Sequence, residues 1–217
     1  MRAWLKQLFF LLIVDPIIFI VLGLNIRHRE LLPKNGPAII VANHNSHLDT
    51  VVLMSLFPHF LLPKLRPVAA ADYFLSSRLW SFIALKLIGI IPITRNRKFG
   101  GSDPLQAAVE SLEAGEILIL FPEGTRGEPE IMANFKSGVA HLAKRFPQIP
   151  VIPIFLHGLG KALPKGEGIL VPFFCDVFVG EPLFWSGDKA EFITSLEAKV
   201  KSLPGRNLTA NWDDEES

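Results

Sequence analysis

The stretch AIIVANHNSHLDTVVLMSLF, residues 38–57, joins a short apolar segment to a polar cluster and then to a second apolar segment. Residues 38–42 have the length and the two-sided apolar character of a strand that is buried on both faces. Residues 48–56 contain few helix breakers and have helical length. The polar cluster therefore lies at the carboxyl end of a predicted strand, where the chain turns into a predicted helix.

This alternation of short apolar strands and helical stretches recurs along the chain. Further strands are expected at 67–71, at 89–93, from 116 up to Pro122, at 151–156 and within 169–183. Helices are expected at 77–87, 103–114, 137–145 and 191–202, the second of them capped by Asp103 and ended by Gly115. Strands apolar on both faces and separated by helices predict an α/β fold with a largely parallel central sheet covered by helices.

Length and composition are those of one domain with a short appendage. The chain has 217 residues, of which 49% are hydrophobic, and its net charge is +1. So small a net charge offers no global attraction for nucleic acid, and we expect no nucleic-acid partner. A single cysteine, Cys175, excludes an internal disulfide.

Much of the apolar excess lies in one run, Leu8 to Leu24, interrupted by Asp15-Pro16. As a straight helix this run reaches about 25 Å, whereas a bilayer core is about 30 Å thick. Proline removes a helix hydrogen-bond donor, so a kink or turn is expected at Pro16. Basic residues flank the run on both sides: Arg2, Lys6, Arg27, Arg29 and Lys34.

These features predict a kinked or re-entrant membrane anchor that dips into one leaflet, with both ends at the cytoplasmic face. A buried core helix and a single membrane span are the alternatives. The expected organisation is a membrane anchor at 1–30, a globular domain at 31–205 and a disordered acidic tail at 206–217.

Polar clusters follow three predicted strands, at 43–49, 94–95 and 123–126. In open α/β sheets, ligands bind outside the carboxyl ends of the strands. His44 and Asp49 are close enough in sequence to pair, and a carboxylate on one imidazole nitrogen leaves the other nitrogen free as a base. Two alternatives stay open: a metal site formed by His44, His47 and Asp49, and a polar helix cap beside a core histidine.

The stretch FPEGTR, 121–126, forms a tight turn that presents Glu123, Thr125 and Arg126. An arginine fork suits a phosphate monoester, and Arg95 and Arg97 could supply a second arm. A solvated turn with surface charges is the alternative.

Together these stretches resemble the 1-acylglycerol-3-phosphate acyltransferases, also called lysophosphatidate acyltransferases, a family of glycerolipid acyltransferases. The stretches that match the four family motifs, and a fifth that resembles the segment after the third motif, are NHNSHLD (43–49), GIIPITR (89–95), FPEGTR (121–126), VIPI (151–154) and NFKSG (134–138). Order and spacing agree from about residue 36 to 184.

The resemblance implies that His44 is the general base and that Asp49 orients it. It implies a substrate-binding set made of Gly89, Arg95, Glu123, Gly124, Thr125 and Arg126. It further implies direct acyl transfer from acyl-CoA or acyl-carrier protein to the free hydroxyl of lysophosphatidate at a membrane surface. No metal and no further cofactor are implied, and Ser46 and His47 become supporting residues.

The chain departs from the family pattern at two places. Pro92 and Thr94 stand where phenylalanine and an acidic residue are frequent, and VAAADYF, 68–74, lacks a lysine that many relatives carry. Relatives also act on other lyso-lipids, such as lyso-ornithine lipids. A metal-dependent hydrolase and a lipid-binding protein without chemistry remain as alternatives from other functional classes.

Overall fold

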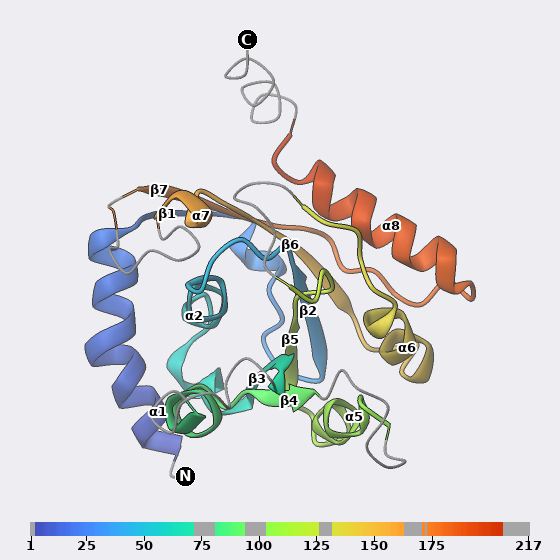
Figure 1. The fold of residues 1–217 in the computed structure, drawn as a ribbon, viewed down its shortest axis with the longest axis horizontal. Helices are drawn as coiled ribbons and strands as arrows, with labels where there is room; N and C mark the ends of the chain where they lie inside the picture. The colour runs from blue at the N-terminus through green and yellow to red at the C-terminus, as the bar shows by residue number, and fades with distance from the viewer. Residues whose placement is uncertain are drawn as a thin grey trace.

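The computed structural model describes residues 3–71, 81–93, 103–125, 132–162, 171 and 173–205. A seven-stranded sheet crosses the molecule in the order β1-β7-β6-β2-β5-β3-β4 (Figure 1). All neighbouring strands are parallel except β6 and β7. The largely parallel α/β fold is thus confirmed. The strands are β1 (Gly23–Arg27), β2 (Ala38–Ala42), β3 (Leu65–Ala70), β4 (Ile91–Ile93), β5 (Ile117–Leu120), β6 (Val151–His157) and β7 (Phe174–Val179).

Helices cover both faces of this sheet (Figure 1). One face carries α1 (Ala3–Phe9), the π-helical turns η1 (Phe10–Val14) and η2 (Ile17–Val21), α2 (Asp49–Ser55), α7 (Leu159–Ala162) and η5 (Ile83–Ile88). The other face carries α5 (Gln106–Glu113), α6 (Gly138–Arg145) and α8 (Lys189–Ser202). The remaining short helices are η3 (Arg29–Leu31) and η4 (His59–Lys64).

The central strand β2 explains why the sequence lacks an alternating pattern. Ile40 packs into the apolar core on the α1 and α2 side. Ile39 and Val41 pack into the core on the α5, α6 and α8 side. All five residues of β2 are fully buried. A strand enclosed on both faces stabilises the fold through both cores at once.

The start of α5 differs from the expected one. The sequence predicts a helix that begins at Asp103, whereas α5 begins at Gln106. Asp103 instead closes a preceding turn: its carboxylate accepts the Leu105 N–H and its carbonyl accepts the Gln106 N–H, both at 3.0 Å. Asp103 does use its side chain to bond a following backbone N–H, as predicted, but it closes a turn that precedes the helix.

The N-terminal apolar run forms one helical segment from Ala3 to Val21 without a chain reversal. Asp15 and Pro16 both have right-handed helical backbone angles. The prediction of a turn at Asp15-Pro16 is therefore wrong. The wider π-helical turns η1 and η2 flank Pro16, and such turns relieve the clash between a proline ring and the preceding carbonyl. By length and composition, Ala3–Ile20 is able to cross a membrane.

The inner face of this helical segment belongs to the core of the domain. Phe10, Val14, Ile18 and Leu22, spaced every four residues, are all buried. Polar contacts hold the same face: the Lys6 ammonium donates to the Leu65 carbonyl at 3.0 Å. Burial, helped by the charge of Arg66, lowers the pKa of Lys6 to about 7. This face corresponds to the buried core helix that the sequence left as an alternative.

Asp15, the one acid within the apolar run, also has a partner on the domain. Its carboxylate lies 2.6 Å from Nε2 of His59 in η4. Gln7 adds a hydrogen bond to the His59 carbonyl at 3.1 Å. A carboxylate that is paired in this way does not need to be placed at a turn or in solvent.

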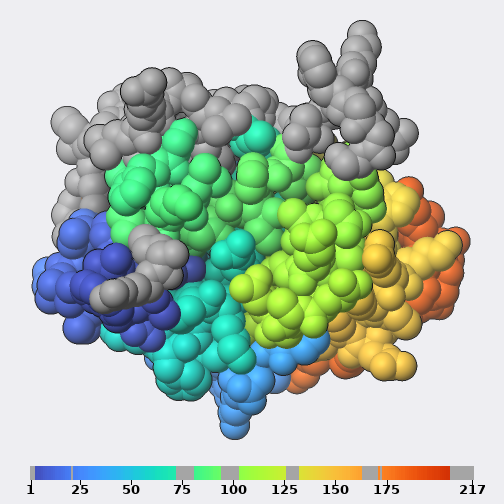
Figure 2. Space-filling view, turned by 90° about the horizontal axis from the view of Figure 1, so that it is seen from below, coloured from blue at the N-terminus to red at the C-terminus, as the bar shows by residue number. Residues whose placement is uncertain are grey.

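The outer face of the helical segment is apolar and exposed. Its exposed side chains are Trp4, Leu5, Leu8, Leu11, Leu12, Ile13, Ile17, Phe19 and Ile20. The helix lies alongside η4 and η5, and Figure 2 shows these dark blue, teal and green segments next to one another. Phe60 in η4 and Phe82, just before η5, are also exposed. Because so large an apolar surface is unusual on a soluble monomer, it marks a site of interaction.

The end of the apolar run forms β1, a strand that the sequence analysis did not predict. Gly23 to Arg27 pair in register with Phe174 to Phe178 of β7 at the edge of the sheet. The helical segment and the first strand therefore follow each other directly. β1 is the first strand in the sheet order and pairs with β7, so it is an edge strand, and its residues alternate between exposed and half-buried.

Candidate active site

The site lies at the carboxyl ends of β2, β5 and β6. β2 and β5 are adjacent and parallel, with Val41 opposite Leu120, so the polar residues that follow them lie side by side. Asn43 joins β2 to β6: its side chain accepts the Leu156 N–H at 2.7 Å and donates to the Leu156 carbonyl at 2.9 Å. These bonds hold the start of the His44 loop in place.

His44 and Asp49 form a hydrogen-bonded pair. Nδ1 of His44 lies 2.8 Å from Oδ2 of Asp49. A carboxylate at this distance accepts the Nδ1–H, which leaves Nε2 with its lone pair. The His44 side chain is 20% exposed and the Asp49 side chain is fully buried. Only the histidine of the pair is thus accessible to a substrate.

The loop between them is built around the same carboxylate oxygen. Oδ2 of Asp49 also accepts the backbone N–H groups of Asn45, at 2.7 Å, and Ser46, at 2.9 Å. Asp49 is the first residue of α2, where the helix dipole favours a negative charge. Burial raises the pKa of Asp49, and the hydrogen bond and charge of His44 oppose that rise.

The turn after β5 packs directly on His44. The Phe121 ring stacks on the imidazole with centroids 4.1 Å apart and an interplanar angle of 20°. Oε1 of Glu123 accepts the His44 backbone N–H at 2.8 Å. The imidazole is therefore oriented by one contact to its ring face, one to Nδ1 and one to its backbone. The sequence signal for Phe121 was its place in FPEGTR, but spacing alone assigned it no role.

Glu123 is 2% exposed, and both of its carboxylate oxygens accept backbone N–H groups. The second donor is Ala133, at 2.9 Å from Oε2. Burial raises the pKa of Glu123, while the two backbone hydrogen bonds oppose the rise. The contacts that the structure gives Glu123 are thus to the protein itself, and they join the His44 loop to residues 132–136.

Gly124 and Thr125 complete the described part of the turn. Gly124 has φ +74°, and a Cβ there would lie 2.6 Å from Nζ of Lys136. The positive φ favours glycine here, and a Cβ would displace the Lys136 side chain. Thr125 is exposed at the rim. The Lys136 contact was not predicted, although its stretch, NFKSG, was singled out by resemblance.

Not all the predicted residues come together at this edge. Arg95 and Arg126, with Arg97, lie outside the described residues. Gly89 precedes β4 and ends η5 with φ +80°, beside Leu65 at the start of β3. Gly89 therefore lies at the amino-terminal ends of the parallel strands β3 and β4, whereas His44 follows the carboxyl end of β2. Its observed role is to reverse the chain between η5 and β4.

The positions of Ser46, His47 and Asp49 bear on the alternative of a metal site. Ser46 is 1% exposed, and its hydroxyl accepts the Leu48 N–H at 3.3 Å, as in a helix-start turn. His47 is exposed, whereas Asp49 is buried. Within the described ranges, no three His, Cys, Asp or Glu side chains are grouped to hold a metal ion.

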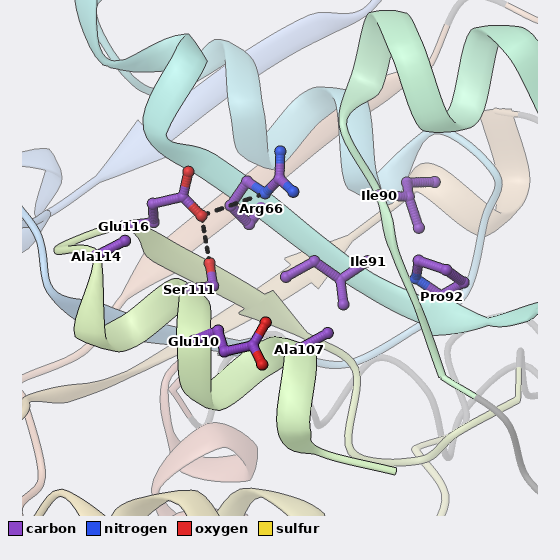
Figure 3. A pocket seen from close by; sticks show the side chains of 9 residues that line it. All are labelled: Arg66, Ile90, Ile91, Pro92, Ala107, Glu110, Ser111, Ala114 and Glu116. Carbon is purple, nitrogen blue, oxygen red and sulfur yellow. Dashed lines mark hydrogen bonds and ion pairs between the residues drawn. The ribbon is translucent and has the colours of Figure 1, made fainter. Parts of the chain in front are cut away.

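A separate cavity of about 310 Å³ lies between α5 and the edge strand β4 (Figure 3). Arg66, at the start of β3, pairs there with Glu116 at 3.3 Å, and Ser111 also donates to Glu116. These charged groups stand near the amino ends of β3 and β5, away from His44. Glu116 is thereby engaged by both Arg66 and Ser111.

Fold and site define an α/β protein with a histidine–aspartate pair at the carboxyl edge of a largely parallel sheet. The model of the Acyltransferase family matches residues 23–157, more than half of the chain. The chain therefore belongs to the acyltransferase family.

Curated relatives carry a common description, 1-acyl-sn-glycerol-3-phosphate acyltransferase. The chloroplastic protein of Brassica napus is 30% identical over 194 residues, covering 86% of this chain and 52% of that protein. The chloroplastic protein of Arabidopsis thaliana is 33% identical over 188 residues, covering 85% and 49%. The alpha form of Homo sapiens is 27% identical over 180 residues, covering 81% and 60%. The chain thus spans about half the length of the plant relatives.

A solved structure shares the fold. The crystal structure of the 1-acyl-sn-glycerophosphate acyltransferase PlsC from Thermotoga maritima superimposes with a TM-score of 0.69. It covers 92% of this chain and 77% of its own, at 22% identity.

Proposed function

We propose that this protein transfers a fatty acyl group from an acyl thioester to the free hydroxyl of lysophosphatidate, giving phosphatidate. The observation that carries the proposal is the His44–Asp49 pair, with Nδ1 engaged and the imidazole reachable at a strand-end edge. The description shared by the relatives supports the choice of acceptor. Lyso-ornithine and other lyso-lipid acceptors are the alternatives.

In the proposed reaction, Nε2 of His44 removes the proton of the acceptor hydroxyl as its oxygen attacks the thioester carbonyl. The tetrahedral intermediate collapses, the C–S bond breaks, and the imidazolium of His44 returns its proton to the departing sulfur, which leaves as a thiol. Asp49 stabilises the imidazolium that forms in between. General-base catalysis of this kind is worth about 10²–10⁴-fold in rate. Arg95, Thr125 and Arg126 are proposed to bind the acceptor.

The donor is proposed to be acyl-CoA or acyl-carrier protein, used as a co-substrate. The proton transfer and the attack need neither a metal nor a further cofactor. Full-length protein in detergent should be offered both donors against a panel of lyso-lipids, with products identified by mass. Phosphatidate formed from lysophosphatidate, unchanged in the presence of chelator, is the expected result. Hydrolysis without transfer, lost in chelator, would favour the metal-dependent hydrolase instead.

Arg126→Ala and Arg95→Ala are expected to raise the KM for lysophosphatidate by about ten- to a hundredfold each, because a charge-assisted hydrogen bond contributes about 1.5–3 kcal/mol. The measurement compares lysophosphatidate with monoacylglycerol, which lacks the phosphate. If the variants lose both acceptors equally, the arginines do not bind phosphate.

We further propose that the outer face of residues 3–21 holds the domain on the cytoplasmic face of a membrane, in the plane of one leaflet. Two observations support this arrangement. The inner face is packed into the core, and the paired Asp15 lies against the domain. A helix whose opposite faces serve the core and the bilayer lies along the interface. Phe60 and Phe82 are proposed to extend the contact.

Leu12→Asp and Ile20→Asp are expected to release the protein from vesicles, each lowering the vesicle partition constant by about thirtyfold. The two side chains are 63% and 81% exposed, so the core is untouched. Losing a buried apolar side chain costs about 2 kcal/mol in the membrane-bound state. Sedimentation with anionic lipid vesicles measures the effect.

Phe184→Asp is the matched control, because Phe184 is 51% exposed and sits between Leu183 and Trp185, which pack against the core on the other side of the sheet. Release by the control as well would contradict the assignment of the surface.

Orientation is tested with an impermeant thiol reagent on intact cells that carry Arg2→Cys or Glu30→Cys. Protection of both positions is expected, whereas labelling of position 2 alone would show a membrane span. Cys175 is buried and contributes little background.

A further inference from the structure

Residues 132–136 are held against the turn that follows β5 by hydrogen bonds from their backbone N–H groups. The Ala133 N–H donates to Glu123, and the Lys136 N–H donates to the Pro122 carbonyl at 2.8 Å. Between them, Phe135 is 8% exposed and donates its N–H to Glu197 of α8 at 3.2 Å. The backbone of Lys136 is thus held at the same turn that packs on His44.

The Lys136 side chain runs across Gly124. A Cβ on Gly124 would lie 2.6 Å from Nζ, 3.1 Å from Cδ and 3.2 Å from Cε of Lys136. The aliphatic stem and the ammonium therefore occupy the space that the missing side chain leaves. Glu123, the neighbour of Gly124, accepts the His44 backbone N–H, so the Lys136 side chain lies over the turn that packs against the His44 loop.

Among the residues that the structure describes, none neutralises the Lys136 charge by a direct contact. Within the described part of the chain, the Lys136 ammonium makes no hydrogen bond and no ion pair. The nearby Glu123 carboxylate has both oxygens engaged by backbone N–H groups. α6 begins two residues later, at Gly138, without a side-chain cap, so its first N–H groups add positive potential on the same side.

We propose that Lys136 binds a substrate phosphate beside His44 and is a specificity-determining residue of this site. The inference rests on the proposed acyl transfer, and it concerns a residue that the transfer itself does not require. Lys136 is exposed, and an ammonium without a partner among the described residues matches a phosphate as a point charge. Two sources share this chemistry: the phosphate monoester of the acceptor and the phosphates of CoA or of a carrier-protein pantetheine.

A structural role is the competing explanation for the same contacts. Lys136 could serve only to balance the buried charge of Glu123 through space. In that case its loss would lower thermal stability and kcat for every substrate alike. A role in phosphate binding instead changes affinity for one phosphate-bearing substrate and leaves phosphate-free substrates unaffected.

The test uses full-length protein in detergent with Lys136→Met, Lys136→Gln and Lys136→Arg. Lys144→Met is the matched control, since Lys144 is an exposed lysine in the last turn of α6. Equilibrium binding of glycerol 3-phosphate and of CoA is measured for each variant. KM values are then compared between lysophosphatidate and monoacylglycerol, and between acyl-CoA and an acyl N-acetylcysteamine thioester.

Lys136→Met and Lys136→Gln are expected to weaken one of the two probes by about ten- to a hundredfold, with the KM of the corresponding substrate rising in parallel. Lys136→Arg should stay within a few-fold of wild type, and Lys144→Met should match wild type. Weaker glycerol 3-phosphate assigns Lys136 to the acceptor, and weaker CoA assigns it to the donor.

Wild-type affinity of Lys136→Met for both probes would overturn the proposal, as would an equal loss for phosphate-free substrates. Melting temperatures of the variants identify a folding defect. If Lys136→Met has such a defect, the probe affinities of Lys136→Gln and Lys136→Arg test the proposal instead. A wild-type protein that binds a probe but transfers no acyl group would refute the proposed function while still testing Lys136. Binding of neither probe by the wild type would refute the phosphate site.

Discussion

His44→Ala is expected to lower kcat by about 10²–10⁴-fold while the protein stays folded. The imidazole is partly exposed, so its removal leaves no closed cavity in the core. Asp49 keeps two of its three hydrogen bonds, those from the Asn45 and Ser46 backbones, and the loop therefore retains its shape. What disappears is the base at Nε2. Turnover on lysophosphatidate and the melting temperature are the two measurements.

His47→Ala is the comparison for this prediction, because it removes an exposed imidazole only three residues away. Activity close to wild type is expected for it. Near-normal turnover of His44→Ala would sink the mechanism. Equal losses in the two variants would return support to a metal site that needs both histidines.

Asp49→Asn has the second-largest expected effect, a loss of up to about 10⁴-fold that does not exceed the loss in His44→Ala. The amide has nearly the same shape, and its oxygen can accept only part of what Oδ2 accepts from His44, Asn45 and Ser46. It also carries no charge to stabilise the imidazolium. The KM values for donor and acceptor should change little, since Asp49 is fully buried.

The double variant separates this mechanism from a purely structural effect. Because Asp49 acts through His44, the His44→Ala/Asp49→Asn variant should be no slower than His44→Ala alone. Losses that multiply would show that Asp49 contributes to turnover independently of the histidine. Thermal melts of all three variants provide the control for folding.

Much of the candidate site was predictable because it is local in sequence. His44 and Asp49 are five residues apart, and one strand-to-helix turn suffices to bring them together. FPEGTR likewise follows a strand that is apolar on both faces, so its place at the carboxyl edge could be predicted from the parallel arrangement. The resemblance to the acyltransferases rested on these same stretches.

Roles that depend on burial could not be obtained in this way. Glu123 was expected to bind substrate, yet its two hydrogen bonds go to His44 and Ala133. Gly89 was expected in the site because its motif ends at Arg95, but a strand separates the two ends of that motif. Which residues a side chain contacts depends on how adjacent strands and loops pack, and no short pattern contains that information.

The N-terminal run shows the same division most clearly. By itself, the sequence determined that residues 8–24 are apolar, flanked by basic residues and interrupted by Asp15-Pro16. Only the tertiary structure decided that Phe10 and Ile18 face the core, that Asp15 pairs with His59 and that Gly23–Arg27 join the sheet. The physical reason is that the hydrophobic effect is non-directional. An apolar side chain is stabilised equally by a protein core or by lipid, and long-range contacts select between them.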